Sequence, residues 1–119
     1  MKPHKRLEIW EEIMKLVEEV YELTKKFPAD EMYGIISQMR RAAISIASNV
    51  AEGCARRSTR EKVQFFIMAR GSLSELDAQL EISLRLNFIN KQENEVVTER
   101  FERVSRMLQG LINSRLIRN

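Results

Sequence analysis

The sequence has few of the residues that make turns, with four glycines and two prolines among its 119 residues. A β-sandwich or β-barrel needs a turn about every ten residues, so this supply excludes both architectures. The one cysteine, Cys54, can form no disulfide within the chain, which favours a reducing compartment. We therefore expect a cytoplasmic protein that is built from a few long elements.

Residues typical of enzyme chemistry and of membrane spans are also scarce. The one histidine, His4, lies in an N-terminal segment that we expect to be frayed, and with Cys54 it cannot make a zinc site. Paired Glu-x-x-His motifs of di-iron proteins are missing, and the glycines form no phosphate-binding loop. No apolar run approaches the roughly 20 residues that span a bilayer. We predict no catalytic residues, metal, cofactor or membrane partner.

Helical periodicity, in contrast, is abundant. Apolar residues recur at alternating steps of three and four in four segments, as they do along one face of a helix. Each segment supplies one stripe of the predicted core. The stripes are Ile9, Ile13, Leu16, Val20, Leu23 and Phe27; Ile36, Met39, Ala43, Ile46 and Val50; Phe66, Ala69, Leu73, Leu76 and Leu80; and Val97, Phe101, Val104, Leu108 and Leu111.

Polar and small residues mark where these helices begin and end. Ser58 and Asn90 each stand three residues before a glutamate, which is the spacing of a capping box. Asp30 is a third candidate N-cap. Pro28 closes the first helix because it disfavours helical geometry at the preceding residue. Gly53 is predicted to end the second helix in a left-handed conformation.

Short loops between long helices make sequential neighbours pack antiparallel. We therefore predict a single all-α domain over residues 1–119, an elongated, up-down-up-down four-helix bundle. Gly71, in the middle of the third helix, is expected to mark a close contact between helices. Apolar surface exceeds what four helices can cover, so we also expect self-association. The surplus lies on the second helix and on a second stripe of the first: Trp10, Met14, Val17 and Tyr21.

The sharpest charge cluster is basic and lies at the start of the third helix. The net charge is −1 over residues 1–53 and +4 over residues 54–119, which permits a nucleic-acid partner. Side chains of the cluster and the free N–H groups of the helix start could hold a phosphate, although an exposed, solubilising loop is the simpler interpretation. The cluster consists of Arg56, Arg57, Arg60 and Lys62.

Two other features near basic residues have simpler explanations. Arg56 and Arg57 could lower the pKa of Cys54, but this cysteine is more simply an incidental small residue. A second basic stripe on the fourth helix should be neutralised by glutamates four residues earlier. That stripe is Arg100, Arg103 and Arg106, with Glu99 and Glu102 as the partners of the last two.

Polar residues also lie inside the two central helices. Arg41, Ser45, Asn49 and Glu52 share one face of the second helix, and Ser72, Glu75 and Gln79 share one face of the third. They could line a binding surface. We favour a structural network in which Arg40 or Arg41 pairs with Glu75 or Glu52 and Asn49 connects loops.

Two segments carry a resemblance to a known family. They read QMRRAAISIASNVAEG at residues 38–53 and ARGSLSEL at residues 69–76, and Phe27-Pro28 with Glu31 and Tyr33 adds to the match. The chain resembles the small four-helix-bundle proteins encoded by intervening sequences within bacterial 23S ribosomal RNA genes. The resemblance implies a similar bundle that assembles into a ring-like homopentamer. A related branch, the accessory proteins of diversity-generating retroelements, forms basic pentameric barrels that bind a reverse transcriptase and nucleic acid.

Three hypotheses on function follow. The first is a non-catalytic homo-oligomer that binds RNA or DNA through Arg56, Arg57, Arg60 and Lys62, with Arg40 and Arg41 as further contacts, and gains avidity from its repeated sites. The second is an adaptor that docks a reverse transcriptase. The third is a self-assembling structural protein with no further ligand.

Overall fold

The computed structural model describes residues 2–118, with side chains for residues 2–5 and 7–115, and this part of the chain contains helices and no strands. The predicted all-α class is therefore confirmed. A 3₁₀ turn at Pro3–Arg6 precedes four long helices. These are α1 (Glu8–Thr24), α2 (Ser37–Ala55), α3 (Thr59–Arg85) and α4 (Lys91–Arg118).

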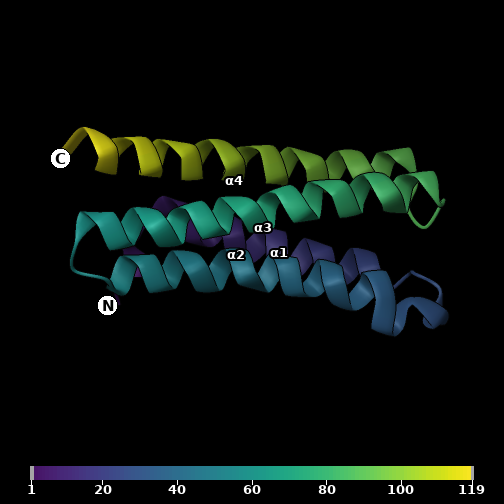
Figure 1. Cartoon of the computed structure of the whole chain (residues 1–119). Coiled ribbons are helices and arrows are strands. Elements are labelled where there is room, and N and C mark those ends of the chain that lie inside the picture. The colour runs from purple at the N-terminus through teal and green to yellow at the C-terminus, as the bar shows by residue number, and fades with distance from the viewer. Residues whose placement is uncertain (1, 119) are drawn as a thin grey trace.

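The four helices lie side by side along one axis (Figure 1). The α1–α2 and α3–α4 connections lie at one end of the molecule, and the α2–α3 connection lies at the other end with both termini. The molecule measures 46 × 24 × 23 Å, so it is about twice as long as it is wide. Each pair of neighbouring helices therefore meets along a long seam, which provides room for extended surface sites.

The core is made by the periodic apolar residues. All members of the first three predicted stripes are buried, and in α4 the stripe holds as far as Leu108. At the end of α4 the buried residue is Ile112, whereas Leu111 is half-buried. Each buried aliphatic or aromatic side chain stabilises the fold by about 1.5–3 kcal/mol, so these stripes supply most of the driving force for folding.

Two of the predicted helix starts have their caps. The Asn90 carboxamide oxygen accepts from the Glu93 N–H at 2.8 Å, and the Glu93 carboxylate accepts from the Asn90 N–H at 2.9 Å. The Ser58 hydroxyl accepts from the Glu61 N–H at 3.1 Å, and it donates to the Glu61 carboxylate at 3.3 Å. These bonds satisfy backbone donors that the first turn of a helix leaves without partners.

The start of α2 differs from the prediction. The segment that was expected to continue from an Asp30 cap forms a 3₁₀ turn, Ala29–Glu31, and a π turn, Met32–Ile36, before the regular helix begins at Ser37. Gly34 has non-helical dihedral angles, φ −109° and ψ −118°, which change the direction of the chain here. Figure 1 shows this irregular turn at the end of the molecule opposite the termini.

Two glycine predictions are wrong. Gly53 lies inside α2, which ends at Ala55, and it has no positive φ. A Cβ at Gly53 would lie 2.7 Å from Cε1 of Phe66, so this glycine is where α2 and α3 approach closely. Gly71 faces outward on α3, and a Cβ there would meet nothing within 4 Å.

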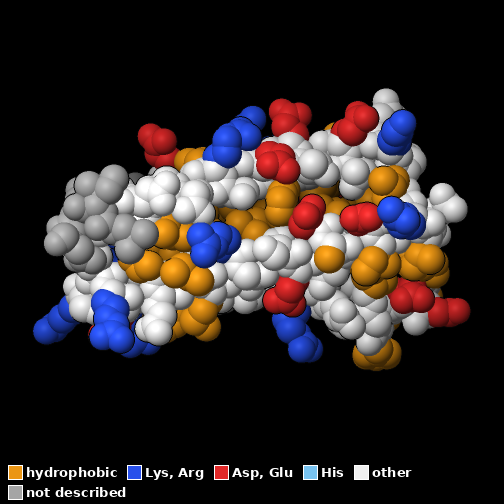
Figure 2. Space-filling model, turned by 45° about the horizontal axis from the view of Figure 1, so that its top comes forward, with side chains coloured by type: hydrophobic (Ala, Val, Ile, Leu, Met, Phe, Trp, Pro, Cys, Tyr) orange, Lys and Arg blue, Asp and Glu red, His pale blue; other side chains and the backbone are white. Residues whose placement is uncertain are grey.

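The surplus apolar stripe of α1 is partly covered. Trp10, Met14 and Val17 are half-buried against the core. His4 packs edge-on against Trp10 with 4.4 Å between ring centroids, so the N-terminal segment is a packed turn and the expected fraying is wrong. Large apolar side chains still face outward on α2 and α3, and Figure 2 shows apolar strips between the charged groups. Those on α2 and α3 are Ile44, Ile67, Met68 and Ile82.

None of the described helices combines the length and apolar character needed to cross a membrane.

Candidate nucleic-acid interface

Half of the basic cluster at the α2–α3 connection is engaged in contacts within the chain. An Nη atom of Arg56 lies 2.8 Å from the Glu52 carboxylate, and its guanidinium lies 4.8 Å from the centre of the Phe65 ring. The Lys62 ammonium donates to the Cys54 carbonyl at 3.1 Å. These two cations therefore help to fix the turn, and their contacts within the chain leave less of their positive charge available to an external anion.

Arg57 and Arg60 are the exposed members of the cluster. Neither forms an ion pair with another residue of the described chain. They flank Ser58, whose cap already occupies the Glu61 N–H that was considered for phosphate binding. Contacts to an anion at this turn would therefore rest on the two side chains.

Burial raises the pKa of the Cys54 thiol, and the charges of Lys62 and Arg115 lower it by a smaller amount. The residue is half-buried and packs against the core. The suggestion that Arg56 and Arg57 lower the pKa of this thiol is therefore wrong: the pKa is raised, because desolvation outweighs the charges of Lys62 and Arg115.

Arg40 and Arg41 lie in a different part of the molecule. They precede the basic turn by some fifteen positions along α2, which corresponds to about 22 Å at the rise of an α-helix. The six residues predicted to contact nucleic acid thus form two sites, one near the start of α2 and one at the α2–α3 connection. Arg41 is exposed, and neither arginine forms an ion pair with a described residue.

The guanidinium of Arg40 is held in place by α1. It lies 4.5 Å from the centre of the Tyr21 ring, and its Nε donates to the hydroxyl of Thr24 at 2.9 Å. Thr24 is buried, and its hydroxyl donates in turn to the Val20 carbonyl at 2.8 Å. This chain of contacts fixes the side chain of Arg40 while it leaves the charge of the guanidinium without a carboxylate partner.

A hollow of about 370 Å³ lies next to these arginines, between α1 and α2. Its lining contains both guanidinium groups and no acidic side chain. The remaining lining is mostly apolar. It consists of Tyr21, Met32, Ile36, Ser37 and Ile44.

The predicted polar network is present only at its centre. The Ser72 hydroxyl donates to the Ser45 hydroxyl at 2.8 Å across the α2–α3 seam, and Asn49 donates to the Ser45 carbonyl at 2.9 Å. Arg41 and Glu75 line a hollow beside this cluster, with no ion pair between them. Glu52 instead pairs with Arg56. Asn49 thus makes its contacts within α2 and connects no loops.

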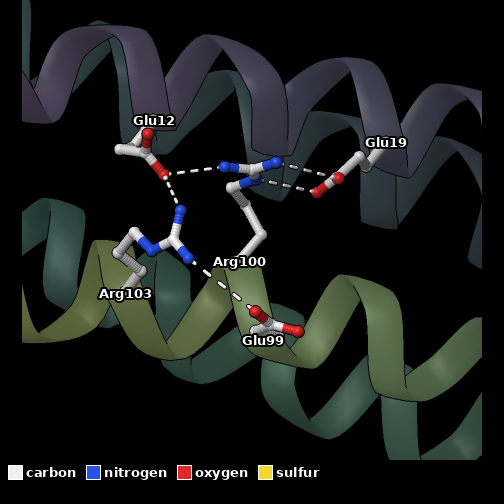
Figure 3. A network of polar contacts seen from close by, with 5 residues as sticks. All are labelled: Glu12, Glu19, Glu99, Arg100 and Arg103. Carbon is white, nitrogen blue, oxygen red and sulfur yellow. Dashed lines mark hydrogen bonds and ion pairs between the residues drawn. The ribbon is translucent and has the colours of Figure 1, made fainter.

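A charge network that the sequence did not indicate joins α1 to α4 (Figure 3). An Nη atom of Arg100 lies 2.8 Å from the Glu12 carboxylate, and its Nε lies 3.3 Å from that of Glu19. Arg103 bridges Glu12 at 3.2 Å and Glu99 at 3.7 Å, the second being the predicted pair within α4. The hydrogen bond that Arg100 donates to Glu12 lowers the pKa of Glu12, and the bonds that Arg100 donates to Glu12 and Glu19 raise the pKa of Arg100.

A second hollow, of about 420 Å³, lies on this α1–α4 side. Its lining includes four glutamates and three cations, and two of the cations form ion pairs there. Lys26 pairs with Glu93 at 2.8 Å, and Arg100 pairs with Glu19. Its apolar floor includes Val96, which is exposed. Little positive charge on this side is therefore open to an anion.

Among residues 2–118, no three histidine, cysteine, aspartate or glutamate side chains lie close enough together to hold a metal ion. The fold and its surface thus define a four-helix, all-α protein with one basic site near the start of α2 and another at the α2–α3 connection. The chain matches the family model described as 23S rRNA-intervening sequence protein over residues 5–110, and it belongs to that family.

A solved structure shares the fold. It is the crystal structure of a protein of unknown function from the S23 ribosomal protein family of Bacteroides thetaiotaomicron, with a TM-score of 0.78 and 16% sequence identity. The match covers 87% of this chain and 97% of that one. No curated protein matches the chain.

Proposed function

We propose that this protein is a non-catalytic homo-oligomer that associates with RNA through its basic surface sites. The observation that carries the proposal is the pair Arg57 and Arg60, two exposed cations without carboxylate partners at one tip of the molecule. Phosphate contacts of this kind supply most of the affinity in binding that is independent of sequence. The family model's description refers to ribosomal RNA genes and is compatible with such a role.

Self-association is supported by the outer face of α3. Met68 and Ile82 are large, exposed apolar side chains on this face, the small residues Gly71 and Ala78 lie between them on the same stripe, and the exposed Glu75 lies at its centre. This outer face, with a large apolar side chain at each end, is a candidate interface. We propose that up-down-up-down bundles pack through it into a ring, a pentamer in keeping with the resemblance, so that weak RNA contacts add by avidity.

The test combines the solution mass with RNA binding at several salt concentrations. The Arg57→Gln/Arg60→Gln double variant should weaken binding and reduce the slope of log K against log salt by about two. Lys25→Gln/Arg85→Gln is the matched control, because both of its cations are exposed but already paired with Glu22 and Glu81. A wild-type protein that shows no retention of structured RNA at low salt contradicts the proposal.

A second candidate is an adaptor that docks a protein such as a reverse transcriptase. The α1–α4 hollow supports it, because Val96 is exposed on an apolar floor between ion pairs. The substitution Val96→Asp should then abolish capture of the enzyme and leave RNA binding unchanged. Loss of RNA binding in the arginine variants with no effect of Val96→Asp on any partner would favour the first candidate.

A further inference from the structure

The hollow between α1 and α2 combines positive charge with an apolar wall. Its volume of about 370 Å³ falls in the range of sites for small molecules or single chemical groups. Both charged residues in its lining are arginines, whereas the α1–α4 hollow has four glutamates in its lining. The occupant that fits the α1–α2 hollow is therefore anionic and has an apolar, flat part.

Arg40 is arranged in advance for such an occupant. The ring of Tyr21 lies beneath its guanidinium, and the buried hydroxyl of Thr24 accepts from its Nε, so the group needs little ordering when an anion binds. An arginine side chain recognises phosphate through two parallel N–H donors. Arg41 follows on the exposed side and adds a second guanidinium at the same hollow.

Tyr33 supplies an exposed aromatic ring that is next in sequence to the lining of the hollow. The residue is 95% exposed, so its ring contributes almost no burial to the fold. It follows Met32, which lines the hollow, in the π turn that precedes α2. Proteins stack unpaired bases on exposed aromatic rings and hold the adjoining phosphates with arginines.

We propose that the α1–α2 hollow binds an unpaired nucleotide of single-stranded RNA, with the base stacked on Tyr33 and the flanking phosphates on Arg40 and Arg41. From Ser37 to Ile44 the site extends for about 10 Å along α2, which suits one nucleotide and its neighbouring phosphate. The base of a duplex is already stacked and paired, so it cannot enter. This inference rests on the proposed function and adds a preference for single strands to it.

Acidic residues lie on two sides of the hollow: two precede Met32 in sequence, and Glu75 lines a separate hollow together with Arg41. Asp30 and Glu31 belong to the 3₁₀ turn before Met32, and neither is in the lining. Glu31 folds back toward Gly34, with its Oε1 3.0 Å from the position a Cβ would take there. The strand of RNA should therefore leave the site along α2, away from this turn.

The test measures fluorescence anisotropy at low salt with a labelled oligouridylate and with a fully paired RNA duplex. Tyr33→Ala should weaken binding of the oligouridylate about tenfold and change binding of the duplex by less than about twofold. Tyr33→Phe keeps the ring and should stay within about twofold of wild type. Leu86→Ala is the control, because Leu86 is an exposed apolar residue at the end of α3 and lies in neither hollow. Oligouridylate that carries 5-iodouridine should crosslink to the peptide containing Tyr33.

Other results would contradict either the inference alone or the proposed function as well. If Tyr33→Ala weakens the oligouridylate and the duplex equally, or weakens neither, the inference is overturned while the proposed function stands. If Tyr33→Ala changes the solution mass and leaves the affinity for RNA intact, Tyr33 belongs to a contact between subunits and the inference is again overturned. If the wild-type protein binds neither RNA, the proposed function fails and the inference fails with it.

Discussion

The arginines on the two flanks of α1 differ in their partners: one is paired with carboxylates and the other is not. On the flank toward α4, Arg100 lies between the carboxylates of Glu12 and Glu19, and its side chain is 21% exposed (Figure 3). On the flank toward α2, Arg40 lies over the ring of Tyr21 and donates to no carboxylate of the described chain. The same side-chain chemistry thus joins two helices on one flank and remains open to an external anion on the other.

The difference arises from what α1 presents to each neighbour. Glu12 and Glu19 are seven residues apart, so they fall on one face of α1 and meet Arg100 from both sides. Tyr21 and Thr24 occupy the face toward α2, where an aromatic ring and a hydroxyl orient a guanidinium but do not neutralise it. We infer that the α4 flank contributes mainly to stability and the α2 flank mainly to binding.

The largest expected effect is on the α4 flank. Arg100→Gln removes the only described partner of the Glu19 carboxylate and one of the two partners of Glu12, and both carboxylates are largely shielded from water. We expect a loss of about 2 kcal/mol in the free energy of unfolding. Urea denaturation measures it as a lower midpoint at constant slope. Arg85→Gln, whose ion pair with Glu81 is exposed, should change stability by less than about 0.5 kcal/mol.

The reverse pattern is expected for the α2 flank. Arg40→Gln/Arg41→Gln should weaken binding of single-stranded RNA at least tenfold, about 1.4 kcal/mol, and leave the urea midpoint nearly unchanged. The matched double variant Arg100→Gln/Arg103→Gln removes the same charge and should lower stability while RNA affinity changes by less than about threefold. Equal losses of affinity in the two double variants would show that the flanks do not differ in function.

The contrast between the flanks also shows where sequence reasoning succeeds and fails. The Asn90–Glu93 capping box and the buried stripes were predictable, because their partners lie three or four residues apart. Arg100 and Glu12 are 88 residues apart, and their contact depends on how α1 and α4 pack. The spacing of Glu12 and Glu19 by seven residues, opposite a helix with Arg100 and Arg103, is the one signal that could have indicated it.

The α2 flank was partly predictable. The sequence pointed to Arg40 and Arg41 as basic candidates, but their positions relative to Tyr21 and Thr24 follow from tertiary packing. The turn around Gly34 was missed because its residues continue the apolar pattern of a helix while the backbone does not. A close helix contact was predicted at Gly71 but occurs at Gly53, because helical position alone does not show which glycine faces a neighbouring helix.

Lowering the pH should reduce the difference between wild type and Arg100→Gln. The pKa of Glu12 lies below its ordinary value of 4.5, chiefly because Arg100 donates to the carboxylate. A carboxylate with a lowered pKa stabilises the folded state above its unfolded-state pKa, and this stabilisation is lost as the pH falls through the folded-state pKa. Urea midpoints of the two proteins should therefore converge between about pH 5 and about pH 3. A constant difference over this range would mean that Arg100 acts by packing instead of by charge.

The smallest expected effect concerns how Arg40 is oriented. Thr24→Val keeps the shape of this buried side chain but removes the hydroxyl that accepts from Arg40 Nε and donates to the Val20 carbonyl. We expect a loss of less than about 1 kcal/mol in stability and about a threefold weaker binding of oligouridylate, since the guanidinium must then be ordered when RNA binds. Thr24→Ser keeps the hydroxyl and should restore binding. If the Thr24→Val and Thr24→Ser variants bind RNA equally, RNA binding at the α2 flank requires the charge of Arg40 but not its fixed orientation over Tyr21.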